Sequence, residues 1–223
     1  MKILCLVPVL PEDLDPECLP SIRNQTMPVN SIKLVTSRVR GGNFPEKVTY
    51  VLNKALEEID LKDYDYLLRV DGDTVLPPDF VEKGVAAGCD LYGTIGYAML
   101  IRVQPFISCM NGRFFRLSND TYIPHCFAAH GFSVLRGDFS KVRTRNKLHS
   151  WMYYYFIGSN YYRLGYTLLH FLVSLKPRPL RVSAMLLAGF LGSWVNRKPK
   201  FDVADTVRTL QINKLKYNLC RAA

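Results

Sequence analysis

Short apolar runs and amphipathic stretches alternate along the chain from residue 1 to about residue 90. The runs have strand length and no polar face, which is typical of strands covered on both faces in a parallel sheet. They lie at Ile3–Val9, Ser31–Thr36 and Tyr64–Val70. Helices are predicted from Asp15 to about Thr26, from Pro45 to about Ile59, and after Pro77. This order predicts right-handed βαβ units and a parallel sheet between helices.

The predicted helices begin at residues that suit a helix start. Asp15 can accept hydrogen bonds from first-turn N–H groups, Pro16 has the fixed φ of a first helical position, and Glu17 faces the positive helix end. The second helix is amphipathic, because six apolar side chains share one face: Val48, Val51, Leu52, Ala55, Leu56 and Ile59. These signals support the strand–helix order of the first half.

The pattern changes after Asp90. Strands are predicted at Leu91–Ile107, Phe114–Ile123 and Phe127–Leu135, with a hairpin turn at Ser118-Asn119-Asp120. A tyrosine-rich helix is predicted over 147–166, ending near Gly165. The Lys176-Pro177-Arg178-Pro179 segment breaks the chain, and two further helices are predicted over 180–195 and 203–219.

Composition places the chain among globular proteins. Its 223 residues are 48% hydrophobic and 22% charged, which excludes a disordered or fibrous chain. The six cysteines are scattered and form no CxxC pair, and no cluster of several cysteines and histidines with a zinc-ligand spacing is apparent. A zinc ribbon and a disulfide scaffold are therefore disfavoured, and a reducing compartment is expected.

Charge is distributed unevenly. Residues 1–140 carry a net −3, and residues 141–223 carry a net +13. An excess of cations indicates an anionic partner: a membrane surface, a lipid phosphate or nucleic acid. The apolar stretch 180–195 is too short and polar for a membrane span, but its flanking cations resemble those of an interfacial helix; the alternative is a helix buried against the domain. The flanking cations are Arg178, Arg181, Arg197, Lys198 and Lys200.

We therefore expect residues 176–200 to contact an anionic membrane surface. Nucleic acid is disfavoured because no nucleic-acid-binding motif is present. No signal peptide is expected, because the apolar start, Met1–Leu10, is followed at once by Glu12, Asp13 and Asp15 and lacks a small-residue cleavage site. The predicted location is the cytoplasm, peripheral on the inner face of the membrane.

Candidate chemistry lies in Asp71-Gly72-Asp73, directly after the third strand. Ligands of open α/β sheets bind outside the carboxyl ends of the strands. Two carboxylates so close together repel each other unless a cation neutralises them, and Mg²⁺ or Mn²⁺ prefers such oxygen ligands. Gly72 would let the backbone approach a ligand. The alternative is a solvated turn, which Asp and Gly also favour.

Several segments resemble family-2 glycosyltransferases of the GT-A fold. Asp71–Phe80 is similar to the family's DxD block, and Leu6–Val9 resembles its first strand and nucleotide-contacting loop. Cys18–Pro28 is similar to its first helix, Asn53 to an asparagine in the helix before the third strand, and Gly131–Arg136 to a later acceptor-side strand with its arginine. The resemblance covers about residues 1–140.

The resemblance implies a three-layer GT-A sandwich with a mainly parallel central sheet, and the charge and apolar pattern beyond it predicts a helical, basic, membrane-proximal extension. We therefore expect a catalytic domain at 1–175, with a nucleotide-binding half at 1–88 and an acceptor half at 89–175, and the extension at 176–223. The resemblance also implies an inverting transfer from a nucleotide-diphosphate sugar to a glycan or lipid-linked acceptor. Asp71 would bind the ribose, and Asp73, with Asp71 close by, the Mn²⁺ or Mg²⁺. Donor contacts would come from Pro8, Val9, Asn53, Gly72 and Arg136.

The sequence departs from the family pattern at two places. No carboxylate follows the second strand to read the nucleotide base, since that segment is Thr36–Arg40. No acid occurs between Asp138 and Asp202, where inverting members have a Glu-Asp pair that supplies the general base. The candidate substitutes are Asp138, His130 and His149, and His130 could instead complete the metal shell.

Three explanations of the missing base stay open. Either one of the substitutes is the base, or the acceptor is acidic, such as a polyprenyl phosphate, and needs no protein base, or catalysis has been lost. The last defines a second hypothesis, a catalytically silent GT-A module that binds a nucleotide or glycan. A third, a sugar-phosphate nucleotidyltransferase, is disfavoured because Pro8–Asp15 is acidic and has no glycine.

Overall fold

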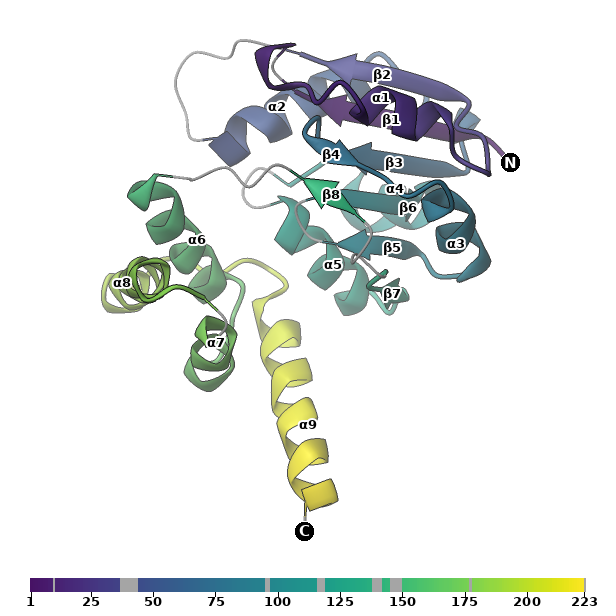
Figure 1. Cartoon of the computed structure of the whole chain (residues 1–223). Coiled ribbons are helices and arrows are strands. Elements are labelled where there is room, and N and C mark those ends of the chain that lie inside the picture. Colours follow the sequence, from purple (N-terminus) through teal and green to yellow (C-terminus); the bar gives the residue numbers. More distant parts are fainter. Residues whose placement is uncertain are drawn as a thin grey trace. The chain divides into compact units, whose positions relative to one another are not determined.

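A six-stranded sheet with the order β2-β1-β3-β6-β5-β7 forms the centre of the N-terminal part of the chain (Figure 1). Its strands are β1 (Ile3–Pro8), β2 (Ser31–Val35), β3 (Tyr66–Val70), β5 (Leu91–Thr94), β6 (Ala98–Arg102) and β7 (Val134–Leu135). β1 pairs in parallel with β2 and β3, and β7 in parallel with β5, whereas β6 runs antiparallel to β3 and β5. The mainly parallel sheet is therefore confirmed.

The computed structural model describes residues 1–9, 11–36, 44–94, 97–115, 119–137, 142–144, 150–176 and 178–222. The chain divides into two units, unit 1 (Met1–Asn146) and unit 2 (Lys147–Ala223). The described helices of unit 1 are α1 (Cys18–Arg23), α2 (Phe44–Leu56), α3 (Phe80–Ala86), α4 (Val103–Met110) and α5 (Asn119–Ala129). Short 3-10 turns lie at Pro11–Asp13 and Leu61–Asp63, and a small second sheet pairs β4 (Thr74–Val75) with β8 (Arg143–Thr144).

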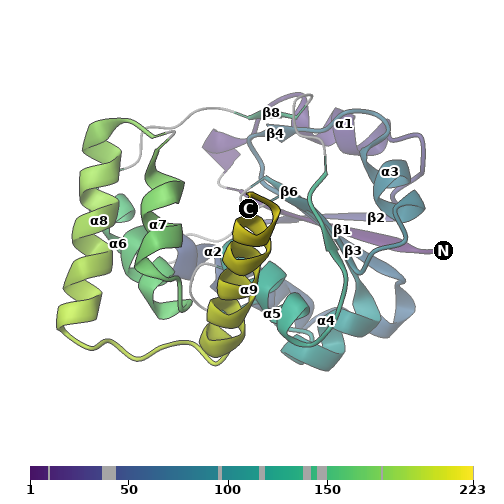
Figure 2. The ribbon, with the colours of Figure 1, turned by 90° about the horizontal axis from the view of Figure 1, so that it is seen from below.

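Helices cover both faces of the sheet, and the alternation of side chains along β1 shows how. Leu4 and Leu6 belong to the core that α2, α4 and α5 complete, while Ile3, Cys5 and Val7 belong to the core that α1 and α3 complete. In Figure 2 the sheet lies between α1 and α3 on one side and α4 and α5 on the other. The first strand is thus buried on both faces, as its continuous apolar sequence indicated.

The strand predicted at 91–107 is confirmed in β5 and β6, but the strand predictions are wrong over Val103–Met110 and Asn119–Ala129, where the chain is helical. In α4, Val103 and Phe106 are buried three residues apart, and in α5, Ile123 and Phe127 are buried four residues apart, which are helical spacings. Pro124 inside α5 hid this pattern, because proline argues against a helix interior. Asn119 and Asp120, interpreted as a hairpin turn, instead begin α5. Of the strand predicted at 127–135, only β7 forms.

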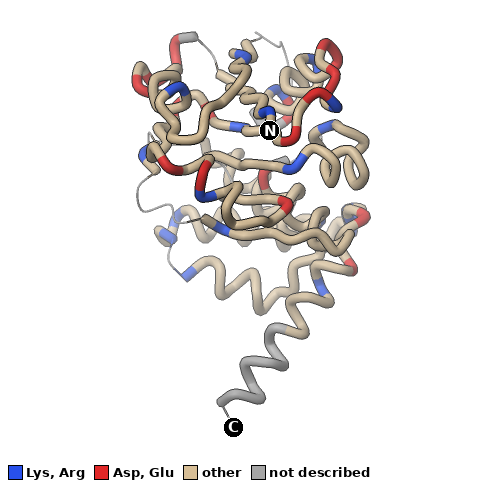
Figure 3. The backbone as a smooth tube through the Cα atoms, turned by 90° about the vertical axis from the view of Figure 1, so that its right-hand side faces the viewer, with Lys and Arg blue, Asp and Glu red and all other residues tan. Residues whose placement is uncertain are grey.

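Unit 2 is helical in its described part. It contains α6 (Trp151–Arg163), α7 (Leu168–Leu175), α8 (Leu180–Val195) and α9 (Ala204–Ala222). The three helices predicted from sequence are present, and α7 was missed. Acidic positions, red in Figure 3, lie mostly in unit 1; those described in unit 2 are Asp202 and Asp205. The boundary between the two units, at 146/147, differs from the domain boundary predicted at 175/176. The assignment of 147–175 to the catalytic domain therefore stays a prediction.

α6 and α8 pack so closely that their backbones touch. A Cβ atom added at Gly158 would lie 1.9 Å from the carbonyl oxygen of Leu186, and one added at Gly189 would lie 1.9 Å from that of Tyr155. The hydroxyl of Ser193 donates to that of Ser159 at 2.7 Å. Small residues at these positions are therefore what permits the crossing.

His125 is enclosed within unit 1 on α5. Burial, with the nearby positive charge of Arg136 as a second cause, lowers the pKa of His125 to about 4 from an ordinary value of 6.5. The native state therefore holds this imidazole neutral, whereas the unfolded chain protonates it below pH 6.5.

We expect unit 1 to lose up to about 3 kcal/mol of stability from this residue as the pH falls from 6.5 to 4. The loss occurs because the unfolded state takes up a proton in this range that native His125 does not. Hydrogen exchange of α5 peptides measures this loss of stability directly. Tryptophan fluorescence would not, because both tryptophans, Trp151 and Trp194, lie in unit 2. His125→Gln should make the stability of unit 1 less dependent on pH between 6.5 and 4 than the matched change His170→Gln in α7 does. If stability falls equally steeply with pH in both variants, His125 is not the group responsible.

Candidate functional site

The predicted acidic motif lies where the sheet topology places a ligand site. Asp71-Gly72-Asp73 follows the carboxyl end of β3, and β1, which pairs with β3 in parallel, ends beside it. The Asp71 N–H donates to the carbonyl oxygen of Tyr97 at 2.9 Å, and the Thr74 N–H donates to that of Asp71 at 2.9 Å. These backbone bonds hold the loop at both ends.

Gly72 packs directly against the loop that follows β1. A Cβ atom at position 72 would lie 2.2 Å from Cγ2 and 2.4 Å from Cβ of Val9, so any larger residue there displaces Val9. The N–H of Asp15 donates to the Gly72 carbonyl oxygen at 2.9 Å. The structure thus brings the predicted Pro8–Val9 segment and the acidic motif together. The glycine is needed for this contact between two loops, in addition to any approach to a ligand.

A buried arginine lies beneath the acids. Nη2 of Arg69, the fourth residue of β3, lies 2.6 Å from Oδ1 of Asp71, and the Arg69 side chain is only 5% exposed. Its Nε and Nη1 atoms are buried without a hydrogen-bond partner in the part of the chain that the structure describes. Sequence reasoning missed Arg69, although a cation inside the apolar run Tyr64–Val70 was a signal that could have found it.

Negative charge accumulates around this arginine. Burial raises the pKa of Asp71 to about 7; Arg69 opposes the rise, and the carboxylates of Asp120 and Asp73 add to it. Asp120, in the first turn of α5, was also missed, because its segment was interpreted as a turn between strands. Three carboxylates with one cation leave an excess of negative charge. Their oxygen atoms are hard donors, which suits a divalent cation such as Mn²⁺ or Mg²⁺.

Asn53 acts between elements of the fold. Its Nδ2 donates to the carbonyl oxygen of Phe114 at 3.0 Å, and its Oδ1 accepts from the Phe114 N–H at 2.7 Å. The side chain therefore joins α2 to the segment that connects α4 with α5. The donor contact expected of Asn53 is not seen in these bonds and stays a prediction.

Of the remaining predicted residues, the structure describes Arg136 and His130, both in unit 1. Arg136 is exposed after β7 and lies close enough to His125 to affect its pKa. His130 follows α5 at the end opposite to Asp120, about 15 Å along the helix axis, so the structure does not bring it to the acidic motif. Asp138 and His149 lie outside the described residues.

Comparison with known proteins identifies the fold. No family model matches the sequence, and no curated protein matches it. Among solved structures, the mannosyltransferase PcManGT from Pyrobaculum calidifontis, in complex with GDP-Man and Mn²⁺, aligns with a TM-score of 0.56 at 12% identity, over 96% of this chain and 80% of its own. TarS 1-349 from S. aureus, in complex with UDP-GlcNAc, aligns with a TM-score of 0.52 at 14% identity, over 86% of this chain and 72% of its own. The chain therefore has the GT-A fold of nucleotide-diphospho-sugar glycosyltransferases, as its sequence motifs predicted.

Proposed function

We propose that this protein is a metal-dependent, inverting glycosyltransferase. It would move a sugar from a nucleotide-diphosphate sugar to a glycan or lipid-linked acceptor. The observation that carries the proposal is the placement of Asp71-Gly72-Asp73 at the carboxyl end of β3, against the loop after β1, in a GT-A fold. Support for the donor class and for the ion comes from the two structural neighbours, whose complexes contain GDP-Man with Mn²⁺ and UDP-GlcNAc.

The residues of the motif would divide the work of donor binding. Asp73 would hold the divalent ion, and Asp71, fixed in orientation by Arg69, would bind the ribose. The contact between Val9 and Gly72 keeps the two loops at a constant separation, so that Pro8 and Val9 can contact the nucleotide. When bound, the ion would offset the charge that develops on the departing nucleoside diphosphate.

The general base is proposed only among those predicted candidates whose position in the structure does not exclude them. His130 is not retained, because it lies at the far end of α5 from Asp120. Asp138 and His149 stay proposals from sequence. An acidic acceptor such as a polyprenyl phosphate would need no protein base, because its attacking oxygen is already ionised near neutral pH.

A second function, a silent module that binds nucleotide or glycan, follows from the same gap. No acid occurs between Asp138 and Asp202, where inverting members supply their base. The two functions differ in one measurement, because a silent module binds the nucleotide without transferring or hydrolysing the sugar.

We expect Asp73→Ala to lower metal-dependent turnover of the nucleotide-sugar about 100-fold or more, because the ion loses a direct ligand. Turnover would be measured with a panel of donors and with Mn²⁺ or Mg²⁺. The matched control is Asp63→Ala, which removes an exposed carboxylate at the other end of β3. Turnover that is unchanged by metal removal and by Asp73→Ala would refute the metal-dependent mechanism proposed for this site, and nucleotide binding without turnover would favour the silent module.

The loop contact gives a second prediction for the same site. Gly72→Ala places a methyl group within van der Waals overlap of Val9, and we expect a stability loss of about 1–3 kcal/mol with weaker nucleotide binding. Val9→Ala removes the opposing methyl groups, so the double variant should recover part of both losses. Thermal unfolding and nucleotide titration of the two single variants and the double variant measure this. Strictly additive losses would show that the two loops do not constrain each other.

We also propose that unit 2 attaches the protein to the inner, anionic face of a membrane. None of the helices in the described part of the chain combines the length and the hydropathy that a membrane crossing needs. α8 buries Leu186 and Phe190 against its neighbours, so one face of it is packed within the unit. Large apolar side chains are nevertheless exposed on α7 and at the ends of α8: Leu168, Leu169, Leu172, Val173, Leu180, Trp194 and Val195. Exposed apolar groups beside cations are typical of interfacial attachment.

We expect co-sedimentation with phosphatidylserine vesicles that is lost in neutral vesicles and weakens with salt, because cations near the surface contribute about 1 kcal/mol each. The double variant Lys176→Glu/Arg181→Glu should weaken binding at least 10-fold, since both exposed cations flank the start of α8. The variant Lys54→Glu/Lys62→Glu makes the same charge change at exposed positions in unit 1 and should bind normally. Equal binding by both double variants would contradict attachment through residues 176–200.

A further inference from the structure

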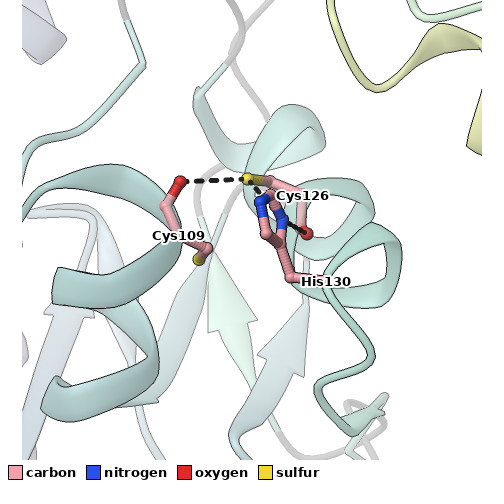
Figure 4. Close-up of side chains that lie close together, drawn as sticks. All are labelled: Cys109, Cys126 and His130. Carbon is pink, nitrogen blue, oxygen red and sulfur yellow. Dashed lines mark hydrogen bonds between the residues drawn. The ribbon is translucent and has the colours of Figure 1, made fainter.

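Two thiols and an imidazole converge between α4 and α5, away from the acidic motif (Figure 4). Cys126 and His130 stand four residues apart and therefore on one face of α5 and the turn that continues it, where the His130 N–H donates to the Cys126 carbonyl oxygen at 3.1 Å. Cys109 comes from the last turn of α4. Cys126 and His130 are only four positions apart, but Cys109 lies 17 positions before Cys126, so the sequence spacing alone did not announce the three-residue cluster.

The distances suit a single ion. One ligand atom from each residue can be chosen so that all lie within 4.8 Å of one another, and Sγ of Cys126 lies 3.8 Å from Nδ1 of His130. A tetrahedral ion with bonds of about 2.3 Å to sulfur and 2.0–2.1 Å to nitrogen holds its ligand atoms roughly 3.5–4 Å apart. Small side-chain shifts would therefore close the cluster around an ion.

The surroundings also suit coordination. Nδ1 of His130 lies 2.8 Å from the Cys126 carbonyl oxygen, so an ion bound at Nδ1 would take the place of this hydrogen bond. Cys126 is buried, Cys109 is half-buried and His130 is exposed, so an ion could enter from the solvent side. In the metal-free arrangement the Cys126 thiol donates to the Cys109 carbonyl oxygen at 3.7 Å and lies 3.8 Å from Nδ1 of His130.

We propose that Cys109, Cys126 and His130 form a Zn²⁺ site that joins α4 to α5, with water completing the coordination. Thiolate and imidazole ligands select Zn²⁺ over Mg²⁺ and Mn²⁺, whereas the carboxylates near β3 have the opposite preference. The site is therefore distinct from the proposed donor site and does not depend on the proposed function. Its effect would be structural: by fixing the end of α5 to α4, the ion would also help to position Asp120 at the other end of α5.

The test uses the full-length protein, reduced and stripped of metal with a chelator, and then titrated with Zn²⁺ or with Co²⁺ as a spectroscopic probe. We expect one equivalent to bind, with the thiolate-to-cobalt absorption of a tetrahedral site and slower hydrogen exchange in α4 and α5. Cys109→Ser, Cys126→Ser and His130→Gln should each weaken binding at least 100-fold. Because His130 is exposed, His130→Gln keeps the test decisive if a cysteine variant fails to fold.

Three matched variants serve as controls. Cys89→Ser removes a buried free thiol elsewhere in unit 1, His170→Gln removes an imidazole in unit 2, and Asp73→Ala removes a carboxylate of the proposed donor site. All three should bind Zn²⁺ normally, which separates this site from the glycosyltransferase proposal. The proposal is overturned if the metal-free protein takes up no equivalent of Zn²⁺, if His130→Gln binds as tightly as the unaltered chain, or if mass spectrometry finds a Cys109–Cys126 disulfide instead of bound metal.

Discussion

The pairing of Arg69 with Asp71 is the constraint around which the site at the end of β3 is arranged. Arg69 lies within a central strand and is almost fully buried, so its charge has lost most of its contact with water. Burying a charge in this way is costly unless an opposite charge compensates it, and breaking such a pair is strongly destabilising. Asp71 provides that compensation, and the position of its carboxylate is thereby fixed by the sheet itself.

The same pair explains why the acids can lie close together. Asp73 and Asp120 both disfavour ionisation of Asp71, and Arg69 opposes them. A hydrophobic residue of similar size in place of Arg69 would remove the only charge among these groups that favours an ionised Asp71. The strand thus carries a cation in its interior so that the loop at its end can carry an excess of negative charge. This excess is the property on which divalent-ion binding would rest.

The sequence predicted the parts of the fold whose pattern is local. The strand predicted at Ile3–Val9 was recognisable from its continuous apolar run. α2 was recognisable because its apolar periodicity and its helix-start residues agree. α4 and α5 were not, because Pro124 and the turn-forming residues Asn119 and Asp120 favoured another interpretation of their apolar positions. Propensities of this kind are weak and give way to tertiary packing.

The candidate site shows the same division. Asp71, Gly72 and Asp73 could be identified, since they are adjacent in the chain and follow a strand. Asp120 gains its significance only when the first turn of α5 is placed near Asp71, and the bond from Asn53 to Phe114 depends on segments 61 positions apart. Groups that are brought together by packing leave no spacing in the sequence. The approach of Cys109 to Cys126 and His130 is a further case, because Cys109 comes from another helix.

The absence of an acid between Asp138 and Asp202 connects the two units of the chain. An inverting transfer to a sugar hydroxyl needs a proton acceptor, whereas transfer to a phosphate does not, because the phosphate oxygen is already ionised. A lipid-linked phosphate would also be found at a membrane surface, which is where the cations and exposed apolar side chains of unit 2 would hold the protein. The missing base and the basic helical unit are therefore explained by one choice of acceptor. A soluble glycan acceptor would leave each of them needing an explanation of its own.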